Sequence, residues 1–182
     1  LGELSYEIHC AASQATHVWE SLLDLGKKFG ISPVGLETQL SCRLEKGHVL
    51  PGLDTDGNTT LFEAHFGWLR DKNRYDMVGG PMLKLLEKAP LRARVTPFLL
   101  EGRVELMEGY LVVSKEKPGR IGYITSVRYS PTLDITIGLA LVEPHLEMNE
   151  NGELILAGGG SEFKSNIAKT PFYDPNGERL NS

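Results

Sequence analysis

Apolar positions recur every three or four residues in the first half of the chain, which is the spacing of an amphipathic helix. Val18, Trp19 and Leu22 share one such face, and Leu36 and Leu40 begin another. Capping residues, glycines and prolines set the limits of these segments. The predicted elements are a short strand over Tyr6–Cys10, a helix capped by Ser13 and ended by Gly26 or Gly30, a helix between Ser32 and Gly47, and a shorter helix between Gly79 and Leu86.

The second half reads differently, because segments rich in Val, Ile and Tyr follow one another with only turn residues between them. Six strands are predicted, over residues 94–100, 109–114, 120–129, 135–142, 153–157 and 162–168. Strands in such a series, without helical periodicity, indicate an antiparallel barrel or sandwich. The change in pattern near Pro90 predicts two domains, residues 1–89 and residues 90–182.

Length and charge exclude several classes of protein. The chain has 182 residues, 19 Lys plus Arg against 24 Asp plus Glu, and a net charge of -5. A basic surface for nucleic acid or for an anionic membrane is therefore not expected. Apolar runs are far shorter than the about 20 residues that span a bilayer, so we expect a soluble, cytoplasmic protein with neither partner.

Polar clusters give little chemistry on their own. The cysteines Cys10 and Cys42 and the five scattered histidines lack metal-site spacing, so no metal is expected. Residues 54–60 alternate oxygen side chains but miss the Gly and Glu of a calcium loop, which favours a solvated Asx-type turn. Gly158–Gly160 and Asn149–Gly152 are expected to be turns.

A series of phrases in fixed order is more specific. The phrases include GELSYEI at 2–8, GLETQLSCRLEKG at 35–47, GLDTDGNTT at 52–60, GYITS at 122–126, YSPTL at 129–133 and PFYDP at 171–175. Together they resemble the folate-dependent aminomethyltransferases, a family that includes the glycine-cleavage T-protein and the C-terminal parts of sarcosine oxidase α subunits and dimethylglycine oxidases.

The resemblance implies an α+β fold, with part of a ferredoxin-like α/β folate-binding half followed by a small antiparallel β-barrel. It implies tetrahydrofolate as the cofactor, with Glu7 matching the family's pteridine-binding acid. An ionised carboxylate can accept both donors of a pterin edge, which agrees with this role. Gln39 stands where T-proteins have a folate-contacting Arg, and it loses that residue's positive charge.

The family's catalytic Asp lies in an upstream segment, so no catalytic residue is expected within this chain. Arg43 and Glu45 are interpreted as an orienting or buried ion pair, and Trp68 as a core residue. The sarcosine oxidase branch is favoured, with FAD and NAD held only on other parts or subunits of the enzyme.

The expected partners are folate, an amine-derived one-carbon substrate, and an upstream segment or flavin-bearing subunit. An uncovered first half would also favour self-association. Two alternatives stay open: a glycine-cleavage T-protein proper, or a non-catalytic docking module of a flavoprotein complex.

Overall fold

The computed structural model describes residues 2–71, 73–114, 119–144 and 152–181. Among these residues, three α-helices lie in the first half of the chain, and short 3-10 turns flank the first of them. Between residues 46 and 80 the chain runs mostly as turns and loops. The helices are α1 (Ala15–Gly26), α2 (Leu36–Glu45) and α3 (Gly80–Leu86).

The second half forms a closed barrel in which every paired strand is antiparallel to its neighbour. Its strands run in the order β1-β4-β3-β2-β5-β6, and β6 closes the barrel by pairing with β1. The strands are β1 (Arg94–Glu101), β2 (Leu111–Val113), β3 (Arg120–Ser130), β4 (Ile135–Val142), β5 (Glu153–Gly158) and β6 (Ser161–Ile167).

The barrel interior is the main hydrophobic core. Phe98 of β1 is fully buried there, and nine other buried residues of the described chain, from five strands, belong to the same cluster. Gly138 of β4 packs so closely against the Phe98 ring that a side chain at this position would overlap the ring. The strand pattern, in which one face is apolar, therefore encloses a packed interior.

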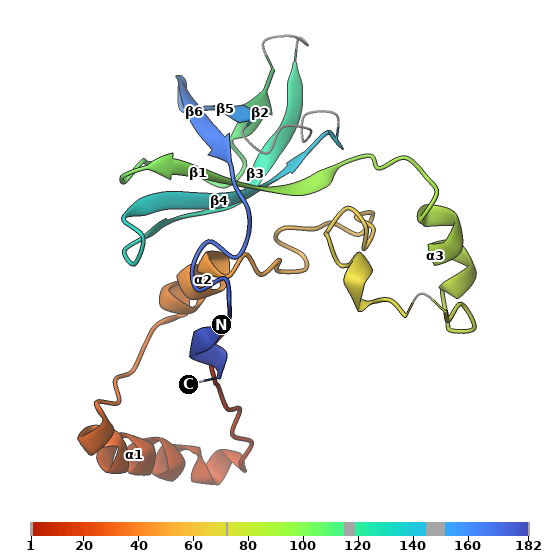
Figure 1. Cartoon of the computed structure of the whole chain (residues 1–182). Coiled ribbons are helices and arrows are strands. Elements are labelled where there is room, and N and C mark those ends of the chain that lie inside the picture. Colours follow the sequence, from red (N-terminus) through yellow and green to blue (C-terminus); the bar gives the residue numbers. More distant parts are fainter. Residues whose placement is uncertain (1, 72, 115–118, 145–151, 182) are drawn as a thin grey trace.

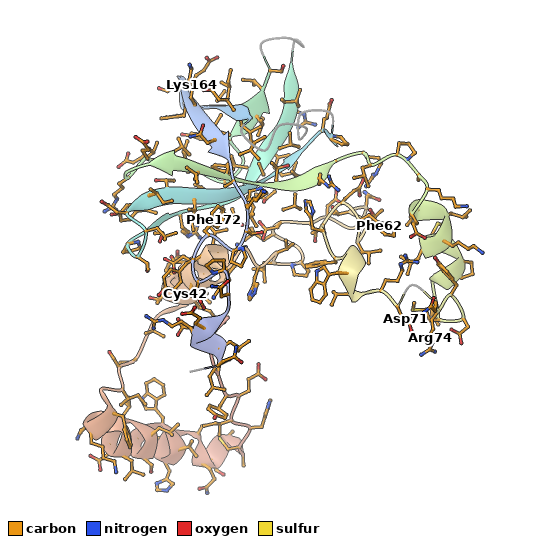
Figure 2. The ribbon with its side chains drawn as sticks, in the orientation of Figure 1. Cys42, Phe62, Asp71, Arg74, Lys164 and Phe172 are labelled. Carbon is orange, nitrogen blue, oxygen red and sulfur yellow. The ribbon has the colours of Figure 1, made fainter. Side chains whose placement is uncertain are left out.

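Helix α2 packs on the outside of this barrel through its last turn. Leu44 is completely buried there and joins Val95, Ile137 and Leu139 in a second apolar cluster. Phe172, on the C-terminal tail, packs against the same cluster, and Figure 2 shows it beside α2 below the barrel. Helices α1 and α3 both lie away from the barrel, α1 at the lower left of Figure 1 and α3 at the right.

The predicted fold class, helices followed by a small antiparallel barrel, is confirmed. All six predicted strands and all three helices are present within a few residues of their expected limits. The strand predicted over Tyr6–Cys10 is wrong, because this extended segment has no partner strand among the described residues. Gly159 and Gly160 form the predicted β5–β6 turn with positive φ angles, whereas most of the turn predicted at Asn149–Gly152 lies outside the described residues.

Candidate functional site

A cleft between the N-terminal segment and α2 brings together the two residues that the sequence singled out. Glu7 and Gln39, 32 positions apart, both line this cavity of about 570 Å³. The Glu7 side chain is 91% exposed, so its carboxylate is accessible. The other lining residues are small, hydroxylic or apolar: Ser5, Tyr6, Val34, Gly35, Leu36, Thr38 and Cys42. The lining carries one negative charge and no Lys or Arg, which suits a ligand edge rich in hydrogen-bond donors.

Ion pairs and hydrogen bonds hold α2 along β3, and so fix one wall of the cleft. Near the start of the helix, Glu37 lies 3.1 Å from Arg128 of β3, and Arg128 also pairs with Glu108 at 2.8 Å. At its end, the buried Glu45 accepts a 2.5 Å hydrogen bond from the Ser130 hydroxyl. These contacts hold both ends of α2 against β3, and Gln39 lies between them in the helix.

The strongest anchor of α2 is a buried carboxylate. Asp54 is completely inaccessible and lies 2.6 Å from the Arg43 guanidinium. The Leu50 amide donates to the same Asp54 oxygen, Oδ2, at 2.8 Å. The other oxygen, Oδ1, accepts hydrogen bonds from Thr125 at 2.7 Å and Ser126 at 2.5 Å. Because every contact of this carboxylate is a donor, the buried charge is compensated.

This network corrects two interpretations of the sequence. The Asx-type turn is present, since Asp56 accepts from the Asn58 amide at 2.8 Å, but Asp54 in the same loop is buried rather than solvated. Arg43 and Glu45 are both buried, as expected of a structural pair, but each bonds to other partners and not to the other. The β3 hydroxyls that complete the network lie over 70 positions away, where sequence spacing carries no signal.

The C-terminal tail closes over the end of α2. Lys46 is buried and lies 2.5 Å from the Asp174 carboxylate, and it also donates to the Asp174 carbonyl at 2.9 Å. The Tyr173 amide donates to the Glu45 carbonyl at 2.9 Å. Tail, helix and barrel are therefore one unit beside the cleft.

A second buried carboxylate, Glu63, organises the loop that leads to β1. It accepts from the amides of Thr60 at 2.8 Å and Arg92 at 2.9 Å, and from the Arg92 guanidinium at 3.2 Å. Burial alone would raise the pKa of Glu63, but these donors outweigh it and lower that pKa to about 2. Glu63 is therefore ionised at neutral pH and acts as a structural acceptor.

Another cavity, of about 540 Å³, lies where this loop meets the barrel. Trp68, which was expected in the core, is 76% exposed and lines the cavity with Phe66 and Lys169. Its position in a one-turn 3-10 helix on an outer loop explains the difference, because no residue of that turn is buried. The core prediction for Trp68 is wrong.

The part of the chain that the structure describes holds neither a cluster of metal-ligating side chains nor a membrane-spanning helix. No group of three His, Cys, Asp or Glu side chains there could hold a metal ion. Both cysteines are free, Cys10 at the surface and Cys42 in the cleft wall. No helix in the described ranges is long and apolar enough to cross a membrane.

The structure is therefore a small antiparallel barrel that carries one helix, α2, on its outer face, with a cleft beside that helix. Two family models match it: the GCVT N-terminal domain over residues 1–74 and the glycine cleavage T-protein C-terminal barrel domain over residues 92–174. The chain belongs to the aminomethyltransferase family of the glycine-cleavage T-protein type.

Relatives of two kinds are similar to it. The aminomethyltransferase of Pseudothermotoga lettingae is 33% identical over 172 residues, which cover 94% of this chain and 46% of that protein. The sarcosine oxidase subunit alpha of Rhizobium meliloti is also 33% identical, over 190 residues, covering 98% of this chain and 19% of the other. The chain thus spans less than half the length of these relatives.

The fold has a solved counterpart. The crystal structure of the glycine cleavage system aminomethyltransferase T from Bartonella henselae matches 90% of this chain and 45% of that chain, with a TM-score of 0.74 and 24% sequence identity. This similarity establishes the shared fold.

Proposed function

We propose that this chain is the C-terminal portion of a tetrahydrofolate-dependent aminomethyltransferase, in which an amine-derived one-carbon unit is transferred to tetrahydrofolate. The observation that carries the proposal is the meeting of Glu7 and Gln39 in one cleft. Glu7 accepts hydrogen bonds from the pteridine ring, and Gln39 both donates and accepts beside it. Residues 1–89 supply this part of the folate site, and residues 90–182 the barrel that holds α2 in place.

The chain's own residues bind and orient the folate; the carboxylate that assists the transfer is contributed by polypeptide outside residues 1–182. Glu7 holds the ring by two hydrogen bonds to an ionised carboxylate, which are stronger than neutral ones. Gln39 carries no charge, so it adds orientation without the electrostatic attraction of an arginine. The barrel contributes indirectly, because β3 holds α2, the helix that carries Gln39, in position.

The sarcosine oxidase α branch is the form of this function that we favour. The similarity to the Rhizobium meliloti subunit runs through 98% of the chain, and Gln39 departs from the T-protein arginine. On this proposal a flavin-bearing part or subunit oxidises the amine, and the folate site receives the released one-carbon unit. FAD and NAD are bound there and not by this chain.

A T-protein proper is the second candidate, because identity to the Pseudothermotoga lettingae aminomethyltransferase is equally 33%. The two are separated by the reaction of the whole gene product. Folate-dependent formaldehyde capture coupled to oxygen or flavin reduction supports the oxidase branch. One-carbon transfer from a protein-bound aminomethyl group, with no redox change, supports the T-protein.

The folate assignment is tested by calorimetric titration of tetrahydrofolate into the whole gene product and its Glu7→Gln variant. We expect Glu7→Gln to weaken binding by about 1.5–3 kcal/mol, the scale of a hydrogen bond to a charged group. Glu162→Gln is the matched control, since Glu162 is exposed on β6 and lies outside the cleft. Equal affinities for the wild type and Glu7→Gln would refute the pteridine contact, and the docking module would then be the better description.

A further inference from the structure

Helix α1 is amphipathic, but no element among the described residues buries its apolar side. Trp19 is 55% and Leu25 is 70% exposed, and no residue of the helix is buried. Its polar residues Thr16, His17, Glu20, Ser21 and Asp24 occupy the opposite arc of the helix. The apolar face of α1 consists of Ala15, Val18, Trp19, Leu22, Leu23 and Leu25.

A helix of 12 residues that buries nothing does not hold its shape in water, because tertiary packing supplies most of the stability of short helices. Figure 1 shows α1 joined to the rest only by its two connecting segments, well away from the barrel. Further apolar side chains are exposed on those segments: Leu4, Tyr6 and Ile8 before the helix, and Phe29, Ile31 and Val34 after it. An exposed apolar region of this extent indicates an interface.

The comparisons indicate what covers it. The matched stretch is 46% of the Pseudothermotoga lettingae aminomethyltransferase, so more than half of that protein lies outside the match. The barrel is by description the C-terminal domain, and residues 1–74 match the N-terminal domain. The unmatched half of the relatives therefore belongs with the N-terminal domain, to which α1 also belongs.

We propose that the apolar face of α1 is the docking surface for a polypeptide equivalent to that unmatched half, and that α1 becomes a stable helix only on docking. The proposal holds whether the polypeptide is joined to this chain or separate from it. Docking buries Trp19, Leu22 and Leu25 together. It also supplies a second wall beside Glu7, whose side chain now faces open solvent.

The test uses residues 1–182 and, as the probe, the unmatched part of the Pseudothermotoga lettingae aminomethyltransferase. Size-exclusion chromatography with light scattering measures the complex, and amide hydrogen exchange measures α1. We expect a one-to-one complex, with amide exchange in α1 slowed by about 100-fold and that of the barrel unchanged. Weak self-association of the chain alone, reversed by the probe, also supports the proposal.

A matched pair of variants locates the surface. Leu22→Asp places a charge on the apolar face, and Ser21→Asp places the same charge one residue away on the polar side. We expect Leu22→Asp to weaken the complex at least tenfold and Ser21→Asp to leave it unchanged, with the same barrel melting temperature in both. Three results would overturn the proposal: no complex, equal effects of the two variants, or a stable dimer that the probe does not dissociate. Folate is absent from every step, so failure of the folate proposal leaves this test intact.

Discussion

The guanidinium of Arg43 and the carboxylate of Asp54 lie 2.6 Å apart at the junction of α2, the 46–66 loop and the barrel. Asp54 is fully buried, and the donors around it come from three separate stretches of chain. Arg43 stands one helical turn after Gln39, so both project from the same side of α2. The pair thus connects the barrel wall to the cleft through a single turn of helix.

Breaking this pair should be costly. Asp54→Asn leaves the buried Arg43 charge without its counter-ion, and we expect a loss of about 3–5 kcal/mol in the free energy of unfolding. Asp56→Asn, two residues along, is the control, because an exposed Asx turn accepts Asn as readily as Asp. Urea denaturation measures both variants. A loss below about 1 kcal/mol for Asp54→Asn would contradict the role of Asp54 as anchor.

Packing inside the barrel is tight at Gly138. A Cβ atom there would overlap the Phe98 ring and the Ser126 carbonyl, so Gly138→Ala should destabilise the protein by about 1–3 kcal/mol. Gly57→Ala meets nothing within 4 Å and should be close to neutral. Thermal unfolding followed by circular dichroism compares the two. Equal melting temperatures for Gly138→Ala and Gly57→Ala would mean that the barrel core can rearrange to accommodate a methyl group at Gly138.

Glu63 should give stability a defined pH dependence. Its ordinary pKa of 4.5 is lowered to about 2 in the folded protein. A lowered carboxyl pKa contributes stability that is complete above the unfolded value and is lost as the pH falls toward the folded one. We expect Glu63→Gln to cost about 2 kcal/mol at pH 7, and this difference to shrink between pH 4.5 and about 2.

The measurement is denaturant unfolding across that pH range, with Glu101→Gln as the control. Glu101 is exposed at the end of β1, so its variant should follow the wild type at every pH. A Glu63→Gln deficit that stays constant down to pH 2 would show that the hydrogen bonds do not depend on ionisation.

The two cysteines should differ in reactivity. Burial, and then the charge of Glu45, raise the pKa of the Cys42 thiol, while Cys10 is exposed. At pH 7.5 we expect iodoacetamide to modify Cys42 at least roughly tenfold more slowly than Cys10. Peptide mass spectrometry over time measures both rates in one sample. Saturating tetrahydrofolate should slow Cys42 further without affecting Cys10, and the absence of that effect would count against the cleft as the folate site.

The barrel could be predicted from sequence because its signals are local. Each of its strands is an apolar run bounded by turn residues, and β4 was placed at Ile135–Val142, where it lies. The Asp54 network could not be predicted, because the sequence around Asp54 gives no indication that the hydroxyls of Thr125 and Ser126 hydrogen-bond to it. The core prediction for Trp68 was wrong for a related reason. Average burial is a property of the residue type, whereas the exposure of Trp68 is set by its position on an outer loop. Glu7 and Gln39 are proposed as folate ligands through the family resemblance alone, since an exposed Glu and Gln carry no signal of their own.

The closing of the barrel by β6 has a consequence during synthesis. β6 pairs with β1 at Phe98 and Ile167, so the last strand to be made is needed to complete the first. Until residue 167 has left the ribosome, the nascent chain is an open sheet with the backbone groups of β1 and β5 unpaired at its two edges. Free edges of this kind recruit other strands. Translation that stalls before β6 should therefore yield aggregates, and a trigger-factor-like chaperone would bind the nascent protein in that interval.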